Sequence, residues 1–110
     1  MRLKDRVAIV TAAAGAGIGQ ATARLMAKEG AHIVVADMHK ERTRAVAEAI
    51  HDEYGVEAMG IQCDVTRLEE VKHTVVMTLE KFNHIDILFN NAGTNRPVRI
   101  VDMSDEVWNL

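Results

Sequence analysis

The stretch that decides the fold is residues 6–19, and it reads Arg6-Val7-Ala8-Ile9-Val10-Thr11-Ala12-Ala13-Ala14-Gly15-Ala16-Gly17-Ile18-Gly19. Its first six residues form a short β-branched run, which predicts a buried strand. Small residues with three glycines follow, and from residue 18 the apolar positions recur at helical spacing. A strand, a glycine-rich turn and a helix in this order can bind a phosphate. The reason is that a helix N-terminus offers unpaired N–H groups and a partial positive charge.

The rest of the chain alternates predicted helices and strands. The first helix should end at Gly30, with an apolar face made of Ile18, Ala21, Leu25 and Met26. We expect strands over 32–36, 57–63 and 85–89, helices over 40–54 and 67–82, a loop over 90–103 and a helix beginning near Ser104. The predicted apolar faces of the two later helices are Thr43, Val46, Ala47, Ile50 and Tyr54, and Leu68, Val71, Val75, Leu79 and Phe82. Strands separated by helices indicate βαβ units, and therefore a doubly wound α/β domain with a parallel sheet.

Composition excludes several classes of function. The chain has 110 residues, a net charge of −3 and basic residues that do not gather into a stripe, so we expect no nucleic-acid partner. No apolar run approaches the roughly 20 residues of a membrane helix, and we expect no membrane partner. The single cysteine, Cys63, predicts no disulfide and is typical of a reducing cytoplasm. The five histidines are scattered, so we expect no metal site.

The turn after the first strand resembles that of a known family. Residues 11–19 are similar to the T-G-x-x-x-G-I-G turn of the short-chain dehydrogenase/reductase family, and Gly17, Ile18 and Gly19 match it. The first family glycine would fall at position 12 or 13, both alanine, and the loop is one residue longer. A strict G-x-G-x-x-G pattern would also place its third glycine at Gln20. The residues alone therefore leave open a small-residue loop that binds no ligand.

An acidic residue follows the second predicted strand. Asp37 lies 18 residues beyond Gly19, close to the spacing of the acid that binds the adenosine ribose in dinucleotide sites. Such a carboxylate accepts hydrogen bonds from the ribose hydroxyls and repels a 2′-phosphate. We therefore predict NAD as the cofactor, with NADP less favoured. The alternative is a solvated acid that opens the next helix.

A second acid follows the third predicted strand, in Cys63-Asp64-Val65-Thr66. This segment resembles the family's D-V pair, in which the acid accepts the adenine amino group and the next residue meets the ring. The resemblance implies these roles for Asp64 and Val65. Taken alone, Asp64 could equally be a turn residue or the N-cap of the helix predicted from residue 67.

The segment after the fourth strand, Asn90-Asn91-Ala92-Gly93, matches the family's N-N-A-G motif without departure. Amides at the end of a central strand can bind backbone groups of neighbouring loops. The small residues Ala92 and Gly93 would let the cofactor come close to the main chain. The resemblance thus implies cofactor-binding roles for Asn90, Ala92 and Gly93, whereas Asn-Asn alone could be only an Asx turn.

Together these motifs imply a Rossmann-type sheet with its first four strands in the order 3-2-1-4. Residues 1–110 would then be the NAD(P)-binding N-terminal part of a single-domain oxidoreductase that moves a hydride between alcohols and carbonyls. The family's catalytic Y-x-x-x-K is absent, because the only tyrosine is Tyr54 and Ala58 stands four residues on; the only serine, Ser104, is expected to cap a helix. Only seven residues follow Met103, which indicates that the chain ends inside a helix. We therefore expect a fragment that is inactive alone.

Two other interpretations remain open. A naturally short, non-catalytic nucleotide-binding or interaction protein would show the same turn and sheet. A doubly wound domain for another nucleotide or a flavin would share the strand–turn–helix unit, although Asp37 and the N-N-A-G segment favour nicotinamide dinucleotides. The resemblance also implies a small alcohol or carbonyl substrate for the full-length protein, and homo-oligomers among its relatives.

Overall fold

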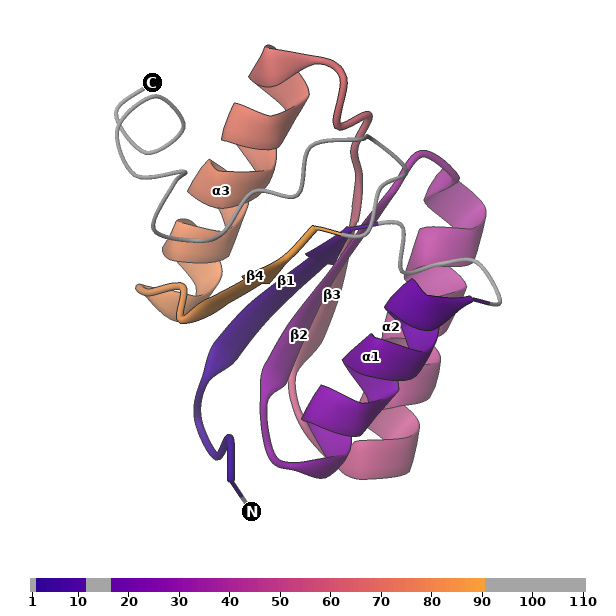
Figure 1. Ribbon diagram of the computed structural model, residues 1–110, viewed down its shortest axis with the longest axis vertical. Helices are drawn as coiled ribbons and strands as arrows, with labels where there is room; N and C mark the ends of the chain where they lie inside the picture. Colours follow the sequence, from indigo (N-terminus) through magenta and orange to yellow (C-terminus); the bar gives the residue numbers. More distant parts are fainter. Residues whose placement is uncertain (1, 12–16, 91–110) are drawn as a thin grey trace.

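A computed structural model of the chain describes residues 2–11 and 17–90. The elements alternate along the chain (Figure 1). They are β1 (Val7–Thr11), α1 (Ile18–Lys28), β2 (His32–Asp37), α2 (Lys40–Tyr54), β3 (Ala58–Gln62), α3 (Leu68–Phe82) and β4 (Ile87–Phe89). The predicted loop over 90–103 and the helix near Ser104 lie outside the described residues, except for Asn90.

The four strands form one parallel sheet in the order β3-β2-β1-β4. The central strand β1 pairs with β2 from Val7↔His32 to Thr11↔Ala36, and with β4 from Ala8↔Ile87 to Val10↔Phe89. This confirms the predicted doubly wound α/β sheet and its 3-2-1-4 order. Because all the strands run in one direction, their carboxyl ends lie at one edge of the sheet.

Helices cover both faces of the sheet: α1 and α2 lie on one face, and α3 lies on the other (Figure 1). Alternate residues of each central strand enter different cores, as the two-residue period of a strand requires. From β1, Ala8 and Val10 join the core under α1 and α2, whereas Ile9 joins the core under α3. The two central strands are apolar over residues 7–10 and 33–36, because both of their faces are buried there.

The predicted apolar face of α1 was wrong at three of its four residues. Ile18 is 70% exposed and Leu25 64% exposed, and Ala21 is exposed as well. The buried positions are instead Gly19, Ala23 and Ala27, with Met26 partly buried against the same core. Helical spacing alone does not say which of two apolar rows faces the sheet. The row of small residues does so here, placing the helix backbone against the strands.

The faces of the other two helices were predicted better. In α2 the buried residues are Thr43, Val46, Ala47 and Ile50, as expected, and Tyr54 packs against them. In α3 only Val75 of the predicted stripe is buried, Val71 and Phe82 are partly buried, and Leu68 and Leu79 are exposed. Thr74 and Thr78 are buried in their place. Each threonine hydroxyl donates to the carbonyl four residues earlier, at 2.9 and 2.7 Å, so burial leaves neither hydroxyl unpaired.

Several predicted boundaries were off by one or two residues. The strand predicted over 85–89 begins at Ile87. The preceding residue, Asp86, is bonded twice to Val7 at the start of β1: its N–H donates to the Val7 carbonyl, and its carboxylate accepts the Val7 N–H, both at 2.9 Å. The first helix ends at Lys28, and Gly30 follows with a φ of 98°. Gly55 ends α2 in the left-handed conformation, and its N–H donates to the His51 carbonyl.

Candidate dinucleotide-binding site

Those predicted site residues that the structure describes lie at the carboxyl ends of the strands and in the segments that follow them. Asp37 is the last residue of β2, and its register partner is Gln62, the last residue of β3. Thr11 ends β1, while Asn90 directly follows β4. In open α/β sheets ligands bind in the crevice at this edge. Ala92 and Gly93 lie outside the described residues.

Gly17 is the N-cap of α1, and its backbone is extended, with φ −139° and ψ −161°. Its carbonyl accepts the N–H of Ala21 at 3.1 Å, which begins the helix. A Cβ built on Gly17 would meet no described atom within 4 Å. Neither backbone strain nor packing of the described residues therefore requires glycine here.

The start of α1 suits an anion in a second way. Its first turn holds no acidic residue, whereas the first turn of α2 contains Glu41 and that of α3 contains Glu69 and Glu70. An anion at the N-terminus of α1 would thus meet the helix dipole without a carboxylate in the same turn. Of the matched residues, Ile18 is exposed and Gly19 is buried against the sheet.

Asp37 is a partly buried residue at the end of β2. Its Oδ1 accepts the backbone N–H of His39 at 3.1 Å, and its carbonyl accepts the N–H of Cys63 at 2.8 Å. His39 is the N-cap of α2. The acid therefore precedes the helix, as the alternative interpretation required, and also stands at the ligand-binding edge of the sheet.

Asp64 organises the turn after β3. Its Oδ1 accepts the Thr66 hydroxyl at 2.6 Å and the Thr66 N–H at 2.9 Å, and these bonds hold the pKa of Asp64 below its ordinary value. The N-cap of α3 is Arg67, so Asp64 is a turn residue and not the cap. Val65 packs partly against the core under α3. The adenine-binding roles of Asp64 and Val65 stay predictions.

The side chain of Asn90 is tied to β1. Its Oδ1 lies 3.1 Å from the hydroxyl of Thr11, which also lies 3.4 Å from the Phe89 carbonyl. Sequence reasoning expected Asn90 to bind backbone groups and missed Thr11 as its partner. The predicted strand order placed the ends of β1 and β4 side by side, but it did not say which side chains meet there.

Cys63 is buried between this edge and α3. Burial raises the pKa of its thiol, and the nearby carboxylates of Glu70 and Asp64 act in the same direction, although a hydrogen bond with Thr74 opposes them. A thiol in these surroundings stays neutral and is a poor nucleophile. Among residues 2–11 and 17–90, no three histidine, cysteine or acidic side chains gather as metal ligands.

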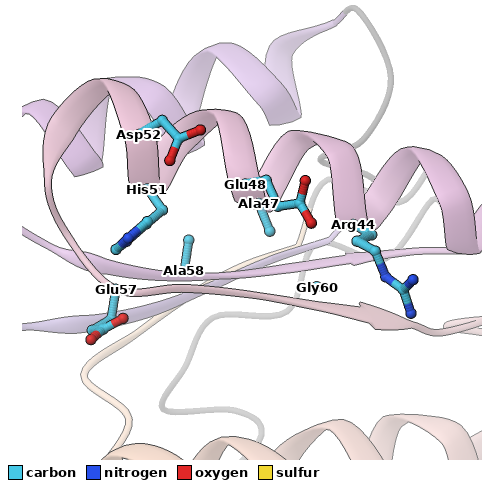
Figure 2. A pocket seen from close by; sticks show the side chains of 8 residues that line it. All are labelled: Arg44, Ala47, Glu48, His51, Asp52, Glu57, Ala58 and Gly60. Carbon is cyan, nitrogen blue, oxygen red and sulfur yellow. The ribbon is translucent and has the colours of Figure 1, made fainter.

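A pocket of about 470 Å³ lies away from this edge, between α2 and the strand β3 (Figure 2). Its ionisable lining side chains, all exposed, are Arg44, Glu48, His51, Asp52 and Glu57. None of the predicted cofactor residues lines it. We therefore place the candidate site at the carboxyl edge of the sheet, where the helix N-termini and strand ends meet.

None of the described helices is long and apolar enough to span a membrane.

The order 3-2-1-4, with helices on both faces and polar residues at the carboxyl edge, defines a Rossmann-type α/β domain. Residues 6–110 match the family described as short chain dehydrogenase, and the chain belongs to that family.

The relatives are similar but longer. A short-chain reductase, NovJ of Streptomyces niveus, is 42% identical over 105 residues, which are 96% of this chain and 39% of that protein. An NAD⁺-bound xylitol dehydrogenase superposes with a TM-score of 0.79 at 40% identity, covering 86% of this chain and 35% of its own. The L-sorbose reductase of Gluconobacter frateurii, complexed with NADPH and L-sorbose, superposes with a TM-score of 0.80 at 35% identity. The match covers 98% of this chain and 41% of that protein. The chain thus spans about two fifths of the length of these relatives.

Proposed function

We propose that the chain is the cofactor-binding portion of an NAD-dependent reductase or dehydrogenase acting on an alcohol/carbonyl pair. The observation that carries this proposal is the position of Asp37. Asp37 ends β2 at the same edge of the sheet as the N-terminus of α1, which begins after Gly17. Family membership supports a nicotinamide dinucleotide as the cofactor, as do the NAD⁺ and the NADPH named with two of the similar structures. The choice of NAD over NADP rests on Asp37 alone.

Different predicted residues would bind different parts of a dinucleotide. The N–H groups at Gly17, Ile18 and Gly19 would hold the pyrophosphate, because a helix N-terminus favours negative charge. The Asp37 carboxylate would accept the ribose hydroxyls. Further cofactor contacts would come from Asp64, Val65, Asn90, Ala92 and Gly93.

The nicotinamide ring, when bound, exchanges a hydride with the substrate carbon. The part that residues 1–110 play is to bind and orient the cofactor. A proton must also move at the substrate oxygen, and the family's Y-x-x-x-K pair that would move it is not in this sequence. We place that step in the full-length protein, of which residues 1–110 would form the N-terminal part of one oxidoreductase domain.

The preference for NAD follows from charge. A 2′-phosphate next to the Asp37 carboxylate would bring two negative groups together, whereas a ribose hydroxyl can donate to it. A hydrogen bond to a charged group contributes about 1.5–3 kcal/mol, so its loss should weaken binding by about tenfold or more.

The test is Asp37→Asn in the full-length protein, with NAD⁺ and NADP⁺ affinities measured by calorimetry. Asparagine keeps an Oδ1 acceptor for the His39 N–H but removes the charge, so the turn is preserved. We expect weaker NAD⁺ binding and a narrower gap to NADP⁺. The proposal is wrong if the wild-type protein binds neither dinucleotide, and the role of Asp37 is wrong if the variant keeps the wild-type ratio.

A further inference from the structure

Hydrogen bonds hold the backbone carbonyl of each residue in the turn 37–39. As described above, the Asp37 carbonyl accepts the N–H of Cys63, and Oδ1 of the same residue accepts the N–H of His39. The Met38 carbonyl accepts Nε2 of Gln62 at 3.1 Å. The direction of the Asp37 carboxylate therefore depends on where the rest of the turn is held.

The third carbonyl of this turn, that of His39, is held by one residue twice. The backbone N–H of Thr43 donates to it at 2.9 Å, and the Thr43 hydroxyl donates to the same oxygen at 2.7 Å. The N-cap residue His39 makes no side-chain cap bond of its own. Thr43 is only 1% exposed, so its hydroxyl acts out of water, where hydrogen bonds are stronger.

Thr43 in turn is seated against Gly60 of β3, which lies under α2 in Figure 2. A Cβ on Gly60 would stand 2.8 Å from the Thr43 carbonyl oxygen and 3.0 Å from both its carbonyl carbon and its Cγ2. Two of these three atoms belong to the helix backbone, so a side chain at Gly60 would have to move the first turn of α2. Gly60 is not in the left-handed region, and the close approach of Thr43 is its steric reason for being glycine.

We propose that Thr43 and Gly60 are positioning residues for cofactor selection. They fix the first turn of α2 on β3 and, through the His39 carbonyl, fix the orientation of the Asp37 carboxylate. This inference rests on the proposed function. A carboxylate that is displaced binds the ribose hydroxyls less well, because hydrogen bonds weaken with misalignment, and it also repels a 2′-phosphate from a greater distance.

The first experiment is Thr43→Val in the full-length protein, which removes the hydroxyl and keeps the shape. We expect about three- to tenfold weaker NAD⁺ binding and a smaller loss for NADP⁺, so that the preference for NAD⁺ narrows. Thr43→Ser keeps the hydroxyl and should retain the wild-type preference.

A matched control comes from α3. The Thr78 hydroxyl donates to the Thr74 carbonyl at 2.7 Å, and Thr78 is 0% exposed, so Thr78→Val removes a bond of the same kind and length. It should lower the thermal midpoint about as much as Thr43→Val does. Its ratio of NAD⁺ to NADP⁺ affinity should stay at the wild-type value.

Gly60→Ala tests the packing of Thr43 on β3 without removing a hydrogen-bonding group, and it carries the test by itself if Thr43→Val does not fold. It should narrow the cofactor preference in the same direction. Gly55→Ala is its control, because Gly55 has a φ of 72° and ends α2 at the far end of the helix. That change should cost stability and leave the preference unaltered.

The outcomes are distinct. The inference is supported if the ratio of NAD⁺ to NADP⁺ affinity falls in Thr43→Val and Gly60→Ala but not in Thr78→Val and Gly55→Ala. An unchanged ratio in both test variants, with NAD⁺ still bound by the wild-type protein, overturns the inference and leaves the proposed function standing. Absence of dinucleotide binding in the wild-type protein overturns both.

Discussion

The hydroxyl of Thr11 lies 3.1 Å from Oδ1 of Asn90 and joins the carboxyl ends of β1 and β4 across 79 positions of sequence. Thr11 is 7% exposed and Asn90 is partly buried, so this contact is partly shielded from water. The contact links the strand that precedes the glycine-rich turn to the first residue of the N-N-A-G motif.

Thr11→Val should therefore destabilise the domain. The variant keeps the shape and loses the donor, and we expect the free energy of unfolding to fall by about 0.5–1.5 kcal/mol in urea titration. Thr11→Ser, which keeps the hydroxyl, should lose less. Equal stability of the valine variant and the wild-type protein would show that the bond contributes nothing.

Gly17→Ala should separate binding from folding. The new methyl group meets no described atom within 4 Å, and the extended backbone of Gly17 accommodates any residue, so the thermal midpoint should change little. The same methyl group would occupy the space in which we place the pyrophosphate, and NAD⁺ binding should weaken at least tenfold, or by about 1.4 kcal/mol. Unchanged NAD⁺ affinity in calorimetry would place the phosphates elsewhere.

Cys63 should react slowly with a thiol reagent in the folded protein. It is 3% exposed and burial raises the pKa of its thiol, so little reactive thiolate forms near neutral pH. The colour change of a disulfide reagent should be slow in buffer and fast in urea. Residues 1–110 contain no other cysteine. Equal rates in the two solvents would contradict the buried position.

Asp64 should make a small contribution to stability against acid. Folding lowers the pKa of Asp64 below its ordinary value. The contribution to stability is therefore fully present above the pKa of the unfolded chain and is lost as the pH falls through the pKa of the folded chain. Asp64→Asn should therefore be less stable than the wild type at pH 6, with the difference shrinking towards pH 2. Urea midpoints at the two pH values measure this. A constant difference would show that the Thr66 bonds do not depend on the charge.

Local pattern determined the architecture of this protein. β-Branched runs such as residues 7–11, separated by periodic segments such as 40–54, specify strands and helices through the two backbone periods, and their alternation leads to a parallel sheet. The sequence likewise placed Asp37 and Asn90 at strand ends, because the distance of a residue from a strand end is a property of the chain alone.

The tertiary structure alone decided which surfaces meet. Periodicity assigned Ile18 and Leu25 to the buried face of α1, but the sheet accepts the row of Ala23 and Ala27, because close approach of two backbones requires small side chains on one of them. The partnership of Thr11 with Asn90 and the seating of Thr43 on Gly60 likewise join residues far apart in the sequence. Such contacts depend on the distance between elements once they have packed, and no local pattern carries that distance.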